Sequence, residues 1–193
     1  MAAMLTDHPP RSASLLSGFL ESDRLTSLAV PHDDRLPALA RSIESAMKDG
    51  KSTLVRQACA ELLTLAADLY KVQRPEVRVL AARPLRVREG GWAAELFGDY
   101  SPEAMLIRVW MRTAVRKQVT SFGTFLSTLC HEFCHHLDYQ HFRFGDSWHT
   151  RGFYQRTAVL YHYMRGTPTK RLFWRRAPGG RWRIDWPRTN RSI

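Results

Sequence analysis

The segment His131–His135 reads His-Glu-Phe-Cys-His, and its residue types and spacing could do metal chemistry. Residues four apart differ by about 40° around a helix axis, so His131 and His135 would project side by side toward one ion. Glu132 would lie about 100° from His131, within reach of a water molecule but not of the metal. We therefore predict Zn2+ as the cofactor, two histidine ligands, and Glu132 as the catalytic general base.

A catalytic zinc site needs a third protein ligand, and four residues downstream are candidates: His136, Asp138, His141 and His149. His136 is one step from His135 and points elsewhere. His141 would complete a spacing that resembles the metzincin peptidases, with Asp138 where they have glycine. On a continuing helix, however, His141 would face about 240° away from His135. His149 follows a Gly-Asp-Ser-Trp loop and opens the next predicted helix, whose first turn can return to the metal. We prefer His149, and His141 stays as the alternative; Asp138 is expected to orient an imidazole.

The elements that must position these residues follow from the apolar pattern. Helical spacing occurs in residues 36–49, 54–71, 121–140 and 149–164, with Ser121 as a plausible cap. Strand-like stretches cover 77–79, 92–97 and 105–111, while Gly90–Gly91 and residues 98–102 are typical of turns. Because helices and strands segregate along the chain, we expect an α+β fold with a small, mostly antiparallel sheet. An extended substrate could then pair along the edge of the strand at 105–111.

The net charge of +11 is concentrated at the C-terminal end. From Arg165 onward the chain has nine basic residues and one acid. Trp174, Trp182 and Trp186 alternate with arginines there, a pattern suited to DNA, with rings on bases and guanidinium groups on phosphates. The alternative is a β-hairpin that packs its tryptophans and leaves its arginines to solvent.

The organisation expected for the chain has three parts. These are a mobile N-terminal arm (1–35, with a short helix around 15–25), a peptidase domain (36–165) and a basic aromatic tail (166–193). Three cysteines form an odd set, which favours reduced thiols. No apolar run is long enough for a membrane span, and residues 1–10 lack the apolar stretch of a signal peptide. We therefore expect a cytoplasmic protein without a membrane partner.

The run from His131 to Arg156 resembles the SprT-like (Spartan-type) zinc metallopeptidases. That family shows His-Glu-x-x-His, a spacer, and then a histidine that opens a helix and is followed by an aromatic residue. The matching positions here are His131, Glu132, His135, His149 and Phe153. The chain departs from the family in having Thr150 where glycine is usual, and no cysteine after Cys134 for a zinc ribbon.

The resemblance implies a minimal zincin-like fold and a zinc-dependent endopeptidase acting on a protein or peptide, with DNA-associated proteins as one substrate class. Two alternatives remain. One is a metzincin-like peptidase that uses His141 and acts on a specific protein without DNA. The other is a nucleic-acid-binding protein in which zinc is structural. Candidates for stabilising an oxyanion, by residue type alone, are Arg151, Tyr154, Tyr161 and His162.

Overall fold

The structure is a computed structural model that describes residues 4–87 and 93–191. It divides into two compact units, which differ from the three parts expected. The helix–sheet unit is Pro31–His141, and the terminal unit combines Met1–Val30 with Phe142–Ile193. The predicted boundaries near 35 and 165 do not coincide with these units, because the two chain ends pack with each other. No helix in the described ranges is long and apolar enough to cross a membrane.

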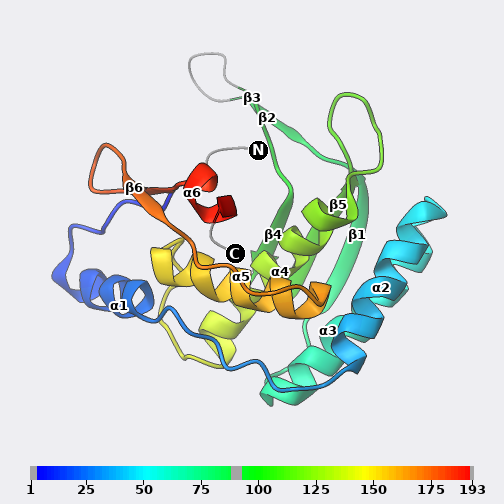
Figure 1. Cartoon of the computed structure of the whole chain (residues 1–193), viewed down its shortest axis with the longest axis horizontal. Helices are drawn as coiled ribbons and strands as arrows, with labels where there is room; N and C mark the ends of the chain where they lie inside the picture. Colours follow the sequence, from blue (N-terminus) through cyan, green and yellow to red (C-terminus); the bar gives the residue numbers. More distant parts are fainter. Residues whose placement is uncertain (1–3, 88–92, 192–193) are drawn as a thin grey trace. The chain divides into compact units, whose positions relative to one another are not determined.

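The helix–sheet unit consists, in chain order, of two helices, a small sheet and a third helix (Figure 1). Helix α2 (Arg35–Lys48) packs on α3 (Ser52–Tyr70), and α3 packs on the sheet. The sheet has the order β1-β5-β4, and α4 lies against β4 and β5. A separate antiparallel ribbon pairs β2 with β3. The bounds are β1 Glu76–Ala82, β2 Leu85–Val87, β3 Ala93–Glu95, β4 Gly98–Ser101, β5 Leu106–Arg112 and α4 Phe122–Gln140.

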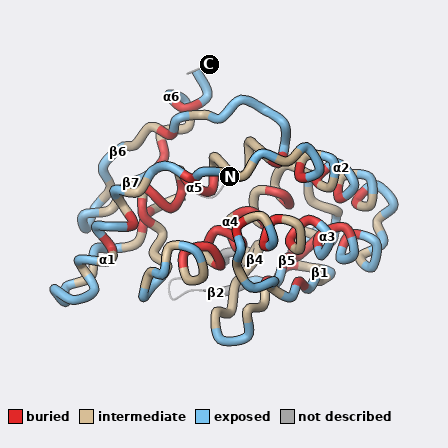
Figure 2. Tube along the Cα trace, turned by 90° about the horizontal axis from the view of Figure 1, so that it is seen from below, coloured by how far each residue is buried: buried red, intermediate tan, exposed pale blue. Residues whose placement is uncertain are grey.

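Helix α4 is the central buried element of this unit. Its apolar face is Phe125, Leu126, Leu129, Phe133 and Leu137, and all five are at most 1% exposed. The red stretch along α4 in Figure 2 shows this burial. The side chain of Ser121 accepts a hydrogen bond from the Thr124 backbone N–H, which confirms the predicted cap. The helix that carries the metal motif is therefore packed into the core of this unit.

The sheet is mixed, and this is where the strand predictions were least accurate. Strand β5 pairs in parallel with β1 and antiparallel with β4, so β5 is the central strand. Residues 98–101 form β4, although their composition predicted a turn, because pairing with β5 outweighs the local turn preference. The predicted turn at 90–91 and the start of the predicted strand at 92 lie outside the described residues.

The terminal unit joins the two chain ends. It contains α1 (Ala13–Arg24), α5 (Arg151–Arg165), the hairpin β6 (Trp174–Arg176) to β7 (Trp182–Ile184), and the short α6 (Trp186–Arg191). The predicted hairpin is confirmed, and Gly179 and Gly180 turn it with positive φ angles. Leu5 forms an antiparallel bridge with Arg183 on β7, so the N-terminal segment that we expected to be a mobile arm lines the hairpin.

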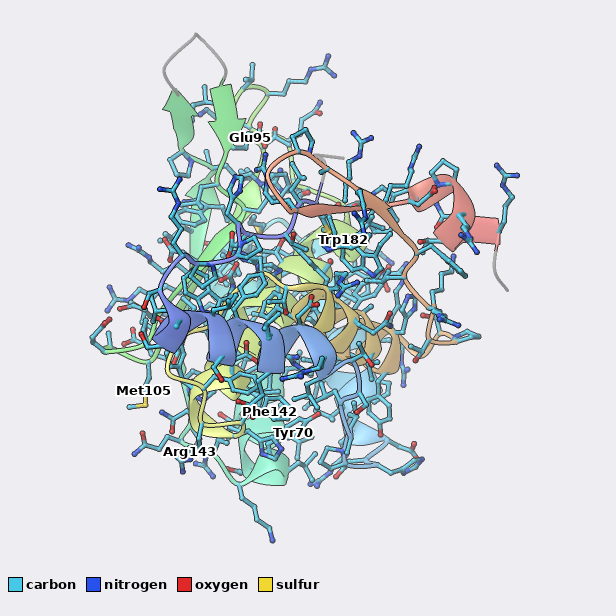
Figure 3. The ribbon with its side chains drawn as sticks, turned by 90° about the vertical axis from the view of Figure 1, so that its left-hand side faces the viewer. Tyr70, Glu95, Met105, Phe142, Arg143 and Trp182 are labelled. Atoms are coloured by element: carbon cyan, nitrogen blue, oxygen red, sulfur yellow. The ribbon has the colours of Figure 1, made fainter. Side chains whose placement is uncertain are left out.

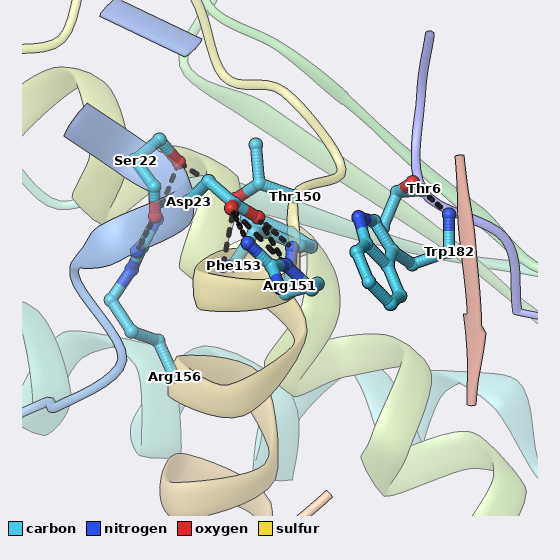
Figure 4. Close-up of polar contacts among 8 residues, drawn as sticks. All are labelled: Thr6, Ser22, Asp23, Thr150, Arg151, Phe153, Arg156 and Trp182. Atoms are coloured by element: carbon cyan, nitrogen blue, oxygen red, sulfur yellow. Dashed lines mark hydrogen bonds and ion pairs between the residues drawn. The ribbon is translucent and has the colours of Figure 1, made fainter. Parts of the chain in front are cut away.

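The end of α1 packs against the start of α5, where Ser22 and Asp23 contact Thr150, Arg151 and Arg156 (Figure 4). The two helices approach closely at Gly152. A Cβ atom on Gly152 would lie 2.0 Å from the Ser22 carbonyl oxygen and 2.6 Å from that of Leu25. The end of α1 is also bound by Arg156, whose Nη1 donates to both of those carbonyl oxygens. Asp23 binds the Arg151 backbone N–H and guanidinium at the start of α5. These contacts fix the first turn of α5, which directly follows His149.

Candidate metal centre

His131 and His135 already face each other on α4. Their Nε2 atoms are 3.2 Å apart and their rings are almost perpendicular. Two ligand nitrogens at the usual distance from one tetrahedral zinc ion are separated by about 3.3 Å. The i, i+4 spacing therefore orients the two imidazoles as the sequence predicted, with the same atom of each ring toward a shared point.

His149 is the third histidine of this group. One ligand atom from each of His131, His135 and His149 can be chosen so that all three lie within 4.8 Å of one another, and the group could hold a metal ion. His149 is also the third ligand that the sequence analysis preferred. His149 stands one residue before Thr150, which caps α5 by accepting from the Phe153 N–H. It therefore lies just outside the helix, where we expected it to open the helix.

His141 does not belong to this group of described residues. Helix α4 runs through Asp138 to Gln140, so the chain makes no turn at the position where the metzincin pattern has glycine. His141 ends the helix, and its ring lies edge-on against Tyr70, with the ring centres 5.4 Å apart (Tyr70 is labelled in Figure 3). His141 thus follows a continuing helix, the geometry that disfavoured it as a ligand in the sequence.

His136, the neighbour of His135, has a structural role. Its Nε2–H donates to the Gln73 carbonyl oxygen at 2.8 Å, so its Nδ1 accepts from the Tyr100 hydroxyl at 2.9 Å. Its side chain is fully buried, and burial holds the pKa of His136 below its ordinary value. The neutral ring links α4 to β4 and to the segment after α3. This linkage helps to keep the motif helix against the sheet.

Glu132 is only 5% exposed and lies against strand β4. Burial raises the pKa of Glu132 to about 8, and the negative charge of Asp99 adds to the shift. A Cβ atom on Gly98 would come within 2.7 Å of Glu132 Oε1, so the absence of a side chain at 98 makes room for the carboxyl group. A carboxyl with a pKa near neutrality can both take up and return a proton. Gly98 is a site residue that the sequence pattern assigned to a turn.

Asp7 is the second residue that sequence reasoning missed. Its Oδ2 accepts a hydrogen bond from the His149 backbone N–H at 2.9 Å and lies 3.3 Å from His149 Nδ1. Burial raises the pKa of Asp7, but the hydrogen bonds and charge of His149 outweigh this, and the pKa is lowered. No pattern could have found Asp7, because it lies 142 residues from its partner in a segment without periodicity.

The donor set fits zinc. Three neutral imidazoles are a ligand set that zinc commonly uses in catalytic sites, and such sites keep a fourth position for water or substrate.

The candidate oxyanion donors gain no support, because three of them make other contacts. Tyr154 donates to the Leu5 carbonyl oxygen, Arg151 pairs with Asp23, and His162 binds Thr167. The three cysteines are buried thiols, as expected.

The C-terminal tryptophans are partly engaged within the terminal unit. The Trp182 ring lies 4.6 Å from the Arg151 guanidinium, and the Trp174 ring is 6.0 Å from the ring of Tyr154 (Trp182 is labelled in Figure 3). Both tryptophans are half-buried.

An open recess of about 430 Å³ lies next to the hairpin. We name its three basic lining residues the arginine patch: Arg175, Arg188 and Arg191, beside Asp185 and Pro187.

No family model, no curated protein and no solved structure gives a significant match to this chain.

Proposed function

We propose that this protein is a zinc-dependent endopeptidase of SprT-like type. His131, His135 and His149 would hold the ion, which would supply a Lewis acid to polarise a carbonyl group and acidify water. The observation that carries the proposal is the buried Glu132 directly beside two histidines whose Nε2 atoms converge. The short distances in the three-histidine group support the ligand assignment.

Glu132 would move one proton through the reaction. Its carboxylate takes a proton from the attacking water as the water oxygen bonds to the scissile carbonyl carbon. When the C–N bond breaks, the same proton passes to the leaving amine nitrogen, so the carboxylate is restored. Its buried position beside Gly98 suits this task, because a low-dielectric site strengthens the proton affinity of the carboxyl.

A substrate peptide would pair with strand β4. We expected a peptide to pair with the strand at 105–111, but β5 lies between β1 and β4 and has both neighbours in place. Strand β4 is at the edge of the sheet, and its first residue, Gly98, touches Glu132. A peptide added to this edge would bring a backbone carbonyl toward the general base.

A purely structural zinc site fits the geometry less well. Structural zinc is usually enclosed by four protein ligands, and it has no use for a buried carboxyl next to two of them. Burying the Glu132 carboxyl also costs free energy, and a structural zinc site has no function that requires a buried carboxyl. The same argument favours an enzyme over a nucleic-acid-binding module.

The decisive experiment compares Glu132→Gln with wild type. Glutamine keeps the size of the side chain but cannot accept the proton, so peptide hydrolysis should fall by roughly a hundred- to ten-thousandfold while zinc content is retained. In parallel, His149→Ala should lose zinc affinity, and His141→Ala serves as the matched control that keeps it. Equal hydrolysis by Glu132→Gln and wild type would refute the mechanism.

We also propose that the peptidase acts on DNA-associated proteins and binds DNA through the arginine patch. The exposed arginines of the patch lie together beside the hairpin, while the half-buried tryptophans leave charge as the main attraction. Proteolysis of a DNA-binding substrate with and without DNA tests this. Stimulation by DNA that disappears at high salt supports it, whereas equal rates with and without DNA would favour a peptidase acting on a free protein.

A further inference from the structure

The N-terminal segment reaches the third ligand through a reciprocal set of contacts. The Asp7 N–H donates to the His149 carbonyl oxygen at 2.9 Å, and the His149 N–H donates to Asp7 Oδ2 at 2.9 Å. The same carboxylate oxygen lies 3.3 Å from His149 Nδ1. One residue thus holds both the backbone and the ring of His149.

The segment around Asp7 is itself anchored along the hairpin. Thr6 donates its N–H to the Trp182 carbonyl oxygen. Its hydroxyl accepts from the Trp182 N–H, the contact drawn in Figure 4. The Ile184 N–H donates to the Met4 carbonyl oxygen, and the Tyr154 hydroxyl donates to that of Leu5. These bonds place the Asp7 carboxylate with little freedom.

A carboxylate at Nδ1 has a defined effect on an imidazole. It accepts the Nδ1–H, which selects the tautomer whose Nε2 carries the lone pair, and its negative charge makes that nitrogen a stronger ligand. The flanking rings of Phe153 and Tyr154 limit rotation of the His149 ring, with ring centres at 5.3 and 5.8 Å. Together these contacts would present His149 Nε2 for metal binding.

We propose that Asp7 is the positioning residue for His149, so that the N-terminal segment is a working part of the metal site. This inference rests on the proposed zinc site and extends it to a residue far from the motif. Loss of the N-terminal segment, which we expected to be a mobile arm, would therefore weaken zinc binding while His131, Glu132 and His135 stay intact.

The test measures zinc affinity of the full chain by competition with a chromophoric chelator. Asp7→Ala should weaken zinc binding by about ten- to a hundredfold, the usual cost of removing such a partner. Asp7→Asn keeps an acceptor oxygen but no charge, so it should fall between alanine and wild type. The visible spectrum of the Co2+-substituted protein should change in Asp7→Ala, because the geometry of the third ligand changes.

Two controls separate positioning from simple folding. Thr6→Ala removes an adjacent anchoring hydrogen bond, and Asp68→Ala removes a surface carboxylate that pairs with Arg74. Asp68→Ala should keep wild-type zinc affinity, and Thr6→Ala should weaken zinc binding less than Asp7→Ala because the backbone bonds of the segment remain. The metal-free Asp7→Ala protein should unfold within a few degrees of wild type. If Thr6→Ala weakens zinc binding as much as Asp7→Ala, the segment acts only as a structural support and the proposal fails.

The ligand variants show which hypothesis fails. If His149→Ala loses zinc affinity but Asp7→Ala does not, Asp7 has no positioning role while the zinc site stands. If wild type and His149→Ala bind zinc equally, the proposed ligand set is wrong and the role of Asp7 falls with it.

Discussion

Replacing Gly152 with alanine tests the close approach of α1 and α5. The added Cβ atom would lie 2.0 Å from the Ser22 carbonyl oxygen, 2.6 Å from that of Leu25 and 2.9 Å from that of Asp23. Backbone carbonyl groups cannot rotate away as a flexible side chain can, so α1 must retreat by about 1 Å or more to relieve the overlap.

That displacement would cost several interactions. The hydrogen bond from Arg156 Nη1 to the Leu25 oxygen is 2.6 Å long, and a retreat of about 1 Å would stretch it beyond hydrogen-bonding range. Each hydrogen bond from a charged group contributes about 1.5–3 kcal/mol, and overpacking costs about 1–3 kcal/mol. Against this, alanine favours a helix over glycine by about 1 kcal/mol. The free energy of unfolding should therefore fall by roughly 2–4 kcal/mol.

Thermal unfolding followed by near-ultraviolet circular dichroism measures the effect. For a chain of this size the Tm should drop by about 5–12 °C. Gly18→Ala is the matched control, because Gly18 lies within α1 and an added Cβ atom there would meet nothing within 4 Å. It should raise stability by up to about 1 kcal/mol. If Gly152→Ala were as stable as Gly18→Ala, the packing of α1 on α5 described above would be incorrect.

Three further predictions follow from the site and its supports. Gly98→Ala should push the Glu132 carboxyl aside and slow peptide hydrolysis by about tenfold or more, as measured by steady-state kinetics. Zinc affinity, measured by chelator competition, should stay within about threefold of wild type. Arg156→Met should lower the free energy of unfolding, measured with urea, by about 2–4 kcal/mol, because it leaves buried carbonyl groups at the end of α1 unsatisfied. Arg35 is exposed, so the control variant Arg35→Met should change this free energy by less than about 1 kcal/mol. Replacing the arginine patch with glutamines should reduce the slope of log affinity for DNA against log salt by roughly two to three, and an unchanged slope would place DNA elsewhere.

The local parts of the site could be read directly from the sequence. Helix α4, its Ser121 cap and its buried apolar face were predicted, because helix periodicity and capping depend on neighbouring residues. The same periodicity disfavoured His141 as a ligand, and turn residues predicted the C-terminal hairpin. Strand β4 was missed, since pairing with β5 decides its conformation and the pairing partner lies outside the local window.

The sequence by itself determined the chemistry of one helix turn: two histidines four residues apart and a glutamate beside the first, which any α-helix presents together. Tertiary structure decided what surrounds them. It set Gly98 against Glu132 and held His149 through Asp7. These contacts join residues far apart in the chain, and a long-range contact leaves no periodic signal in either segment, so only the folded chain could show them.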